Sequence, residues 1–141
     1  MKQHSFFLAT LGAALMSLAF NSNSAETIQS DGVDIEIVTK NPERYDKAKI
    51  RIRGFAERDR HHLQIVQSAE SNVSVVLQMP KRTQRSSSTR DFIEAVYARP
   101  MKETWRGVHG TFTGVFSWRP TKIPRYILVV EDVDNITKEE K

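Results

Sequence analysis

The feature that most constrains the fold is a strict alternation of polar and apolar residues that recurs with glycines inside it. Lys49–Phe55 alternates basic residues with isoleucine and carries Gly54 in its apolar row. Trp105–Phe116 also alternates and contains three glycines. A period of two buries one face of a strand, and glycine lets a strand coil sharply. These two stretches therefore predict long, curved β-strands with nearly the same inner pattern.

Three further stretches have the length and composition of strands. They are Leu63–Gln67, Val73–Met79 and Arg125–Val130, and a short helix is expected to start near Asp91, between the third and fourth strands. Five coiled strands with a helix at this place are the plan of the OB barrel. Closing a sheet into a barrel removes its exposed edges. The sequence thus predicts an all-β fold with one short helix, a five-stranded OB-like Greek-key barrel.

The connecting segments carry weaker signals. Val33–Val38 has a short apolar alternation, which fits either a strand or the end of an approach segment. Asn41–Asp46 starts with a good N-cap residue followed by proline, and this predicts a single helical turn. Lys81–Arg90 is expected to be a basic, serine-rich loop in which Ser88 or Thr89 caps the short helix.

The first 25 residues have the three parts of a cleaved secretory signal peptide: a basic start, an apolar stretch and a polar run of small residues. The apolar part, Phe6–Phe20, is shorter than the roughly 20 residues that a membrane span needs. We expect a periplasmic or secreted protein without a transmembrane anchor once the leader is removed. The predicted division is a signal peptide at 1–25, a flexible lead-in at 26–35, the barrel domain at 36–135 and a charged tail at 136–141.

Cysteine is absent from the whole sequence. An exported protein could use disulfides, and this one has none. Thiol catalysis, thiolate metal sites and lipid attachment at a leader cysteine are excluded for the same reason. The fold therefore depends on its hydrophobic core.

Three stretches carry a resemblance to a known group of proteins: Asn41–Lys47, Lys49–Phe55 and Val108–Phe112. Together they resemble small exported bacterial OB-fold proteins of unassigned function, over about residues 36–135. The chain departs from that group by a lysine-rich approach to the first strand, where glycine is common, and by its basic loop. The periplasmic OB proteins of envelope stress share the leader and size, but Val73–Met79 lacks the carboxylates of their third strand. The resemblance implies a barrel and leaves its ligand open.

Basic and aromatic residues form the candidate ligand-binding surface. The outward strand faces and the first and last hairpins are expected to present Arg51, Arg53, Arg58, Arg60, His109, Thr111, Trp118 and Arg119. Hairpin loops flank the binding face of an OB barrel, so these side chains can converge. Arginine contacts phosphates and aromatic rings stack on bases, as single-strand binding requires. The alternative is that the strand arginines are solvated charges of a half-buried sheet and Trp118 anchors its loop.

Two other groups of basic residues are candidates for binding an anion or a metal. Lys81–Arg90 contains four cations and no acid, so it could clamp a phosphate backbone or an acidic partner. The alternative for this loop is simple mobility. His61 and His62 are adjacent, and neighbours on a strand point to opposite faces, so they make poor joint ligands. We expect no metal site.

No catalytic motif is recognisable. The sequence has neither Gly-x-Ser-x-Gly nor His-Glu-x-x-His. Glu57 and Asp59, near the strand arginines, are only weakly similar to the carboxylates that exported OB-barrel nucleases use. The large aromatic residues are expected in the core: Trp105, Phe112, Phe116 and Tyr126.

These observations favour an exported, monomeric, non-enzymatic binding module without a cofactor. Its predicted ligand is anionic or extended: a protein, a glycan or an oligonucleotide. The net charge of +4 is compatible with weak attraction of polyanions or anionic lipid headgroups, or with ordinary solubilising charge. One alternative is a structural or assembly accessory of the cell envelope that binds a protein. Another is an exported nuclease-like hydrolase that depends on Glu57.

Overall fold

The computed structural model describes residues 32–58, 60–68, 70–98 and 107–138. The expected signal peptide, Asp59 and Trp105 lie outside these residues. The elements in chain order are β1 (Val33–Asp34), α1 (Ile35–Lys40), α2 (Pro42–Tyr45), β2 (Lys49–Arg58), β3 (Leu63–Val66), β4 (Ser74–Gln78), the 3-10 helix η1 (Arg82–Gln84), α3 (Ser87–Tyr97), β5 (Val108–Trp118) and β6 (Tyr126–Lys138).

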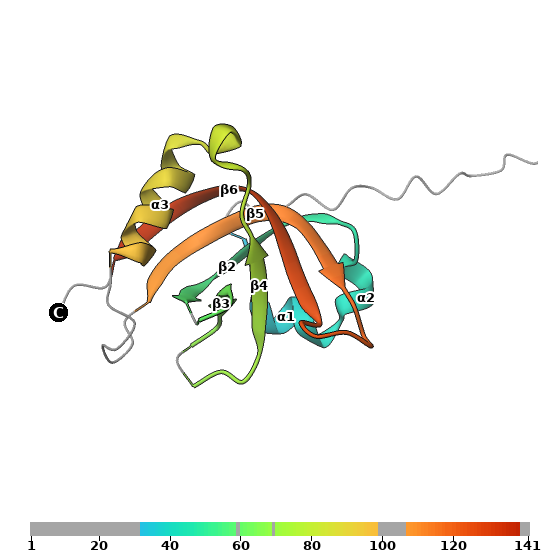
Figure 1. Cartoon of the computed structure of the whole chain (residues 1–141). Helices are drawn as coiled ribbons and strands as arrows, with labels where there is room; N and C mark the ends of the chain where they lie inside the picture. The colour runs from blue at the N-terminus through green and yellow to red at the C-terminus, as the bar shows by residue number, and fades with distance from the viewer. Residues whose placement is uncertain (1–31, 59, 69, 99–106, 139–141) are drawn as a thin grey trace, which may run out of the picture.

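Five strands close into a barrel in the order β2-β3-β4-β6-β5, and β5 returns to pair with β2. The pairs are antiparallel except for β4 with β6, which run parallel. The two-residue β1 pairs in parallel with the edge of β2 that faces away from β5, the edge that β3 also uses. The predicted five-stranded OB-like barrel with a helix between its third and fourth strands is confirmed. Figure 1 shows α3 near one end of the barrel and α2, with the β5–β6 hairpin, near the other.

The alternation that predicted β2 places its residues as expected. Ile50, Ile52 and Ala56 face inward and are buried, whereas Arg51 and Arg53 point outward and are only partly covered. Burial of the apolar row supplies the main driving force for this arrangement. The same side chains thus form one wall of the core.

Three phenylalanines fill the core without any exposed surface. Phe112 and Phe116 come from β5, as predicted, and Phe92 comes from α3. The rings of Phe92 and Phe112 meet edge to face with centroids 5.1 Å apart, a favourable aromatic geometry. Tyr126 is only partly buried and stacks on Phe116 at the margin of the core.

Strand β6 curves because it carries two extra residues relative to β5. Register shifts fall between Thr113 and Gly114 and between His109 and Thr111, which are β-bulges that bend the strand. At the first bulge, a Cβ on Gly114 would collide with the carbonyl oxygen of Val129. Glycine is therefore required there by close approach of the backbone.

Several predicted boundaries are wrong. β6 runs to Lys138, so part of the expected charged tail is strand and pairs with Val108 and His109. For Val33–Val38 the sequence left a strand and an approach segment open; only Val33–Asp34 is strand, and the rest belongs to α1. Ile35 and Val38 are three residues apart and both fully buried, which is helical spacing. The expected flexible lead-in consequently contains β1 and the first residue of α1.

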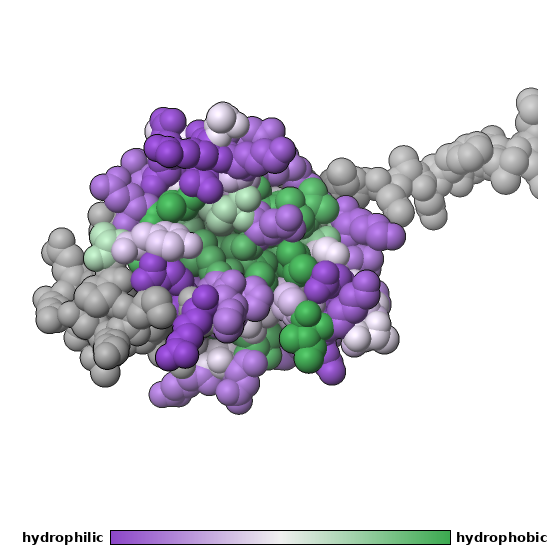
Figure 2. Space-filling view, in the orientation of Figure 1, coloured by the Kyte–Doolittle hydropathy of each residue, from purple (hydrophilic) through white to green (hydrophobic). Residues whose placement is uncertain are grey.

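The basic segment at 81–90 is mostly ordered into helices. Residues 82–84 form η1, and α3 begins at Ser87 with Ser86 as its N-cap. The hydroxyl of Ser86 accepts a hydrogen bond from the backbone N–H of Thr89, so the predicted cap at Ser88 or Thr89 is placed too late. Figure 2 shows hydrophilic side chains gathered over α3 and η1, above hydrophobic side chains in the middle of this face.

Candidate functional site

The outward row of β2 lies beside the outward row of β5. The register sets Arg51 opposite Thr113, Arg53 opposite Thr111, and Phe55 opposite His109. The rings of Phe55 and His109 meet edge to face at 5.1 Å between centroids. The structure therefore brings together Arg51, Arg53 and His109, as expected, and adds an aromatic ring to them.

Arg51 is held by a carboxylate of β6. Its Nη2 donates to both Oδ atoms of Asp134 at 2.9 Å, and its side chain is only 23% exposed. Its Nε is buried and has no hydrogen-bond partner among the described residues. A charge-assisted pair of this kind fixes the guanidinium in place. Arg51 therefore presents a neutralised, partly covered group to the outside.

Thr111 is not part of an open surface, contrary to expectation. It is 1% exposed, because the chain at Gly32 passes over it. A Cβ on Gly32 would lie 3.2 Å from Cγ2 of Thr111 and 3.0 Å from Cγ of Arg53. Sequence alternation places Thr111 on the outward face correctly but cannot show that another segment covers that face.

A hollow of about 140 Å³ opens on the outer side of β2. One edge of β2 pairs with β1 up to Arg53 and with β3 from Phe55 onward, and Gly54 lies between them. The hollow occupies this change of partner. Its lining comes from β1, β2, β5 and the residue after β3: Asp34, Arg53, Gly54, Phe55, Gln67 and His109.

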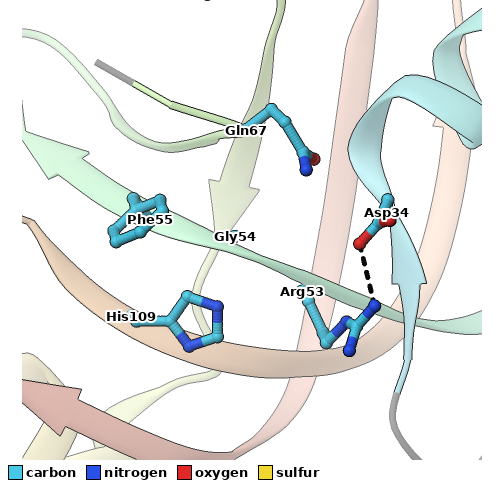
Figure 3. A pocket seen from close by; sticks show the side chains of 6 residues that line it. All are labelled: Asp34, Arg53, Gly54, Phe55, Gln67 and His109. Atoms are coloured by element: carbon cyan, nitrogen blue, oxygen red, sulfur yellow. Dashed lines mark hydrogen bonds and ion pairs between the residues drawn. The ribbon is translucent and has the colours of Figure 1, made fainter.

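The side chains around the hollow differ in chemistry from one side to the other. Figure 3 shows Asp34 and Arg53 together on one side and Phe55 with His109 on the other. Nη2 of Arg53 donates to Oδ1 of Asp34 at 3.0 Å, and both side chains are about 40% exposed. Because the two charges offset each other, the hollow is polar without a large net charge.

Gln67 is the residue that sets the hollow apart. Its Oε1 is buried and has no hydrogen-bond partner among the described residues, and its amide points toward the space between the two sides (Figure 3). A buried acceptor without a partner costs about 1–3 kcal/mol. A ligand that donates a hydrogen bond to this oxygen would recover that free energy.

Asp34, Phe55 and Gln67 were not predicted as site residues. An aromatic residue within an otherwise charged outward row was the available signal for Phe55. Asp34 and Gln67 gave no local signal, because their meeting depends on where β1 and β3 leave β2.

The remaining predicted residues do not converge on the hollow. The first hairpin follows Arg58 beside the start of β5, whereas Trp118 is the last residue of β5 and Arg119 follows it. Eleven residues of strand, roughly 33 Å at 3.3 Å per residue, separate the two hairpins along β5. The guanidinium of Arg58 stacks over the ring of Tyr97 at 4.6 Å, and Arg60 is exposed in its turn.

Trp118 and Arg119 serve the β5–β6 hairpin. The backbone N–H of Trp118 donates to Oδ1 of Asp46 at 2.9 Å, and the indole is half-buried. Arg119 donates from Nε and Nη2 to the carbonyl oxygen of Pro124. Both residues therefore have a structural place at this end of the barrel.

A second polar cluster joins α3 to β6. Oδ1 of Asp132 accepts hydrogen bonds from the hydroxyls of Ser86, Ser88 and Thr89. The hydrogen bond from Ser86 is the largest cause that lowers the pKa of Asp132. Desolvation opposes it, and the N–H of Val133 and the other two hydroxyls reinforce it. The cluster ties the N-terminus of α3 to the barrel.

No group of three His, Asp or Glu side chains within the described residues is arranged to hold a metal ion. Among the helices of the same residues, none has the length and apolar character to cross a membrane. Comparison of the chain with protein-family models and with curated proteins finds no match. The hollow beside Gln67 is thus the feature from which a function can be argued.

Proposed function

We propose that this chain is a non-enzymatic binding module that holds an extended polymer at the hollow between Asp34, Arg53, Gln67 and His109. The leader-like composition of residues 1–25 supports a role outside the cytoplasm. The OB-like barrel is compatible with binding oligosaccharides, oligonucleotides or proteins.

The observation that carries the proposal is the buried, unpartnered Oε1 of Gln67. Most buried polar atoms in folded proteins have a hydrogen-bond partner. The side chain of Gln67 lines a hollow of about 140 Å³, so a small rotation of its amide would present this oxygen to an N–H or O–H group that enters from outside. The guanidinium of Arg53 and the ring of His109 line the same space and can serve an acceptor on that ligand.

The ligand class follows from the balance of donors and acceptors. A peptide group carries one donor and one acceptor, which suits Gln67 on one side and Arg53 or His109 on the other. Phosphates offer acceptors only, and Asp34 already neutralises Arg53 at 3.0 Å. An extended polypeptide therefore fits this site better than an oligonucleotide does, and a glycan with an amide-bearing sugar is the competing ligand.

The test is a two-dimensional amide NMR titration with three probes: a mixture of extended peptides, an oligomer of N-acetylglucosamine and a single-stranded oligonucleotide. We expect the peptides to shift the amides of Gly54, Gln67 and His109. Gln67→Ala should weaken that binding about fivefold or more, because it removes a hydrogen bond worth about 1 kcal/mol.

Gln64→Ala is the matched control, since Gln64 lies on β3, outside the hollow, and bonds to Glu57. It should leave the peptide affinity unchanged. If only the sugar oligomer shifts these amides, the ligand of this site is a glycan instead of a peptide. Shifts that avoid the hollow with all three probes would overturn the proposal.

A further inference from the structure

The loop that joins β5 to β6, residues 119–125, presents an isoleucine almost entirely to solvent. Ile123 is 96% exposed, whereas Tyr97, the next most exposed large hydrophobic side chain among the described residues, is 56% exposed. Scattered apolar residues on a surface are normal. Full projection of a large aliphatic side chain from a hairpin end calls for a reason.

The loop is ordered by its own hydrogen bonds, one of which joins its two ends. The N–H of Arg119 donates to the carbonyl of Arg125 at 2.8 Å, and the N–H of Lys122 donates to the carbonyl of Arg119 at 3.1 Å. The Arg119 side chain adds two bonds to the carbonyl of Pro124, at 3.3 and 3.1 Å. Ile123 is therefore presented by an ordered turn.

Cations surround the projecting side chain. The loop contains Arg119, Lys122 and Arg125 and no acidic residue. The exposed Lys47 joins this end of the barrel, because its backbone N–H donates to the carbonyl of Phe116 at 2.8 Å. Asp46, the nearby carboxylate, accepts from the backbone of Trp118. The end of the hairpin thus combines an apolar tip with excess positive charge.

Two aromatic residues lie just behind the loop. Trp118 and Tyr126 are paired across the first rung of the hairpin and both are partly exposed. Trp and Tyr favour the depth of the lipid headgroups, because their rings are apolar with one polar group. With Ile123 at the tip and these two rings behind it, the hairpin places an apolar side chain deepest and the aromatic rings at the level of the headgroups.

We propose that the β5–β6 loop docks this protein onto an anionic lipid surface. Ile123 enters the boundary between headgroups and acyl chains, and Arg119, Lys122 and Arg125 face the lipid phosphates. A stable protein–protein interface needs about 800 Å² from each partner, more than one hairpin tip offers. A fluid lipid surface closes around a single projecting side chain and needs no preformed pocket.

This docking is independent of the function proposed for the hollow. His109 lies near the start of β5 and the docking loop follows its end. Figure 1 shows the β5–β6 hairpin and α3 at different ends of the molecule. Lipid contact through the loop would leave the hollow open to a ligand.

The test is sedimentation with vesicles, using the chain from Glu26, which retains every buried residue of the described core and lacks the apolar leader. Vesicles of phosphatidylcholine with phosphatidylglycerol are compared with phosphatidylcholine alone. We expect binding to the anionic vesicles only, and loss of it at high salt. Ile123→Ser should weaken partition about tenfold or more, the effect of withholding a large aliphatic side chain from an apolar phase. Lys122→Gln with Arg125→Gln should weaken it by a similar factor.

Two controls carry equal changes far from the loop. Tyr97→Ser removes another exposed apolar side chain, and Lys81→Gln with Arg82→Gln removes two exposed cations. Both should leave partition unchanged. The proposal fails if the chain ignores anionic vesicles or if the controls weaken binding as much as the loop variants. It also fails if Ile123→Ser has no effect while soluble polyglutamate competes, since that would indicate an acidic protein partner.

Discussion

At the scale of single residues, hydrogen bonds between distant polar side chains hold this barrel together. The carboxylate of Asp132 accepts hydrogen bonds from three hydroxyls at the N-terminus of α3. Both carboxylate oxygens of Asp134 accept from Arg51. Sequence patterns predicted that the arginines point outward. They could not predict these partners, because Arg51 and Asp134 are 83 positions apart.

Asp132→Asn should lower the free energy of unfolding by about 1 kcal/mol at neutral pH, since an amide accepts these hydroxyls more weakly than a carboxylate does. The pKa of Asp132 is lower in the folded chain. Its stabilisation is therefore fully present above the unfolded value of about 3.9 and is lost as the pH falls through the folded pKa.

Urea denaturation at neutral pH and at successively lower pH measures this difference between Asp132→Asn and the unaltered chain. The two curves should converge in acid. Glu94→Gln, an exposed change on α3, should leave the stability unchanged at every pH. A gap that stays constant down to low pH would mean that the carboxylate is not the source of the stability.

At the scale of elements, the alternation of polar and apolar residues predicted the long strands correctly. The alternation in β2 and the glycines in β5 predicted both strands, because one face of each is buried along its length. α1 was missed because its six residues are too few to separate a period of two from a helical one. The hollow was missed because it lies where β2 changes partners.

Gly114→Ala should destabilise the chain by about 2 kcal/mol or more, because the new methyl group would meet the carbonyl of Val129 at the bulge. Gly110→Ala is the matched change in the same strand, and its nearest neighbours are side-chain atoms at 3.3 and 3.4 Å. It should cost less. Chemical denaturation of both variants gives the comparison, and equal losses would show that the backbone approach at Gly114 is not limiting.

At the scale of the whole molecule, closure of the barrel depends on the long final strand. The order of strands and the helix between the third and fourth were predictable from the sequence. The far end of β6 was not, because its charged composition resembles a solvated tail. Yet Thr137 and Lys138 pair with the start of β5, beside the hollow.

A chain that ends at Asn135 should therefore melt several degrees lower than one that ends at Lys138, at about 4–8 °C per kcal/mol for a domain of this size. The N–H groups of Val108 and His109 point to opposite neighbours, β2 and β6. The one that faces β6 should also exchange faster with deuterium, since its partner strand is gone, and the one that faces β2 should keep more of its protection. Thermal melting followed by circular dichroism and NMR-detected exchange measure the two effects. Equal melting temperatures would show that these rungs add nothing.

The parallel pairing of β4 with β6 also governs when the chain can fold. β6 supplies partners to both β4 and β5, so neither strand is complete until residues 126–138 are present. A chain that is synthesised or threaded from its N-terminus exposes β2, β3 and β4 long before that point. Synthesis at about 5–20 residues per second makes this interval several seconds long. The barrel can therefore close only after its last strand has been made.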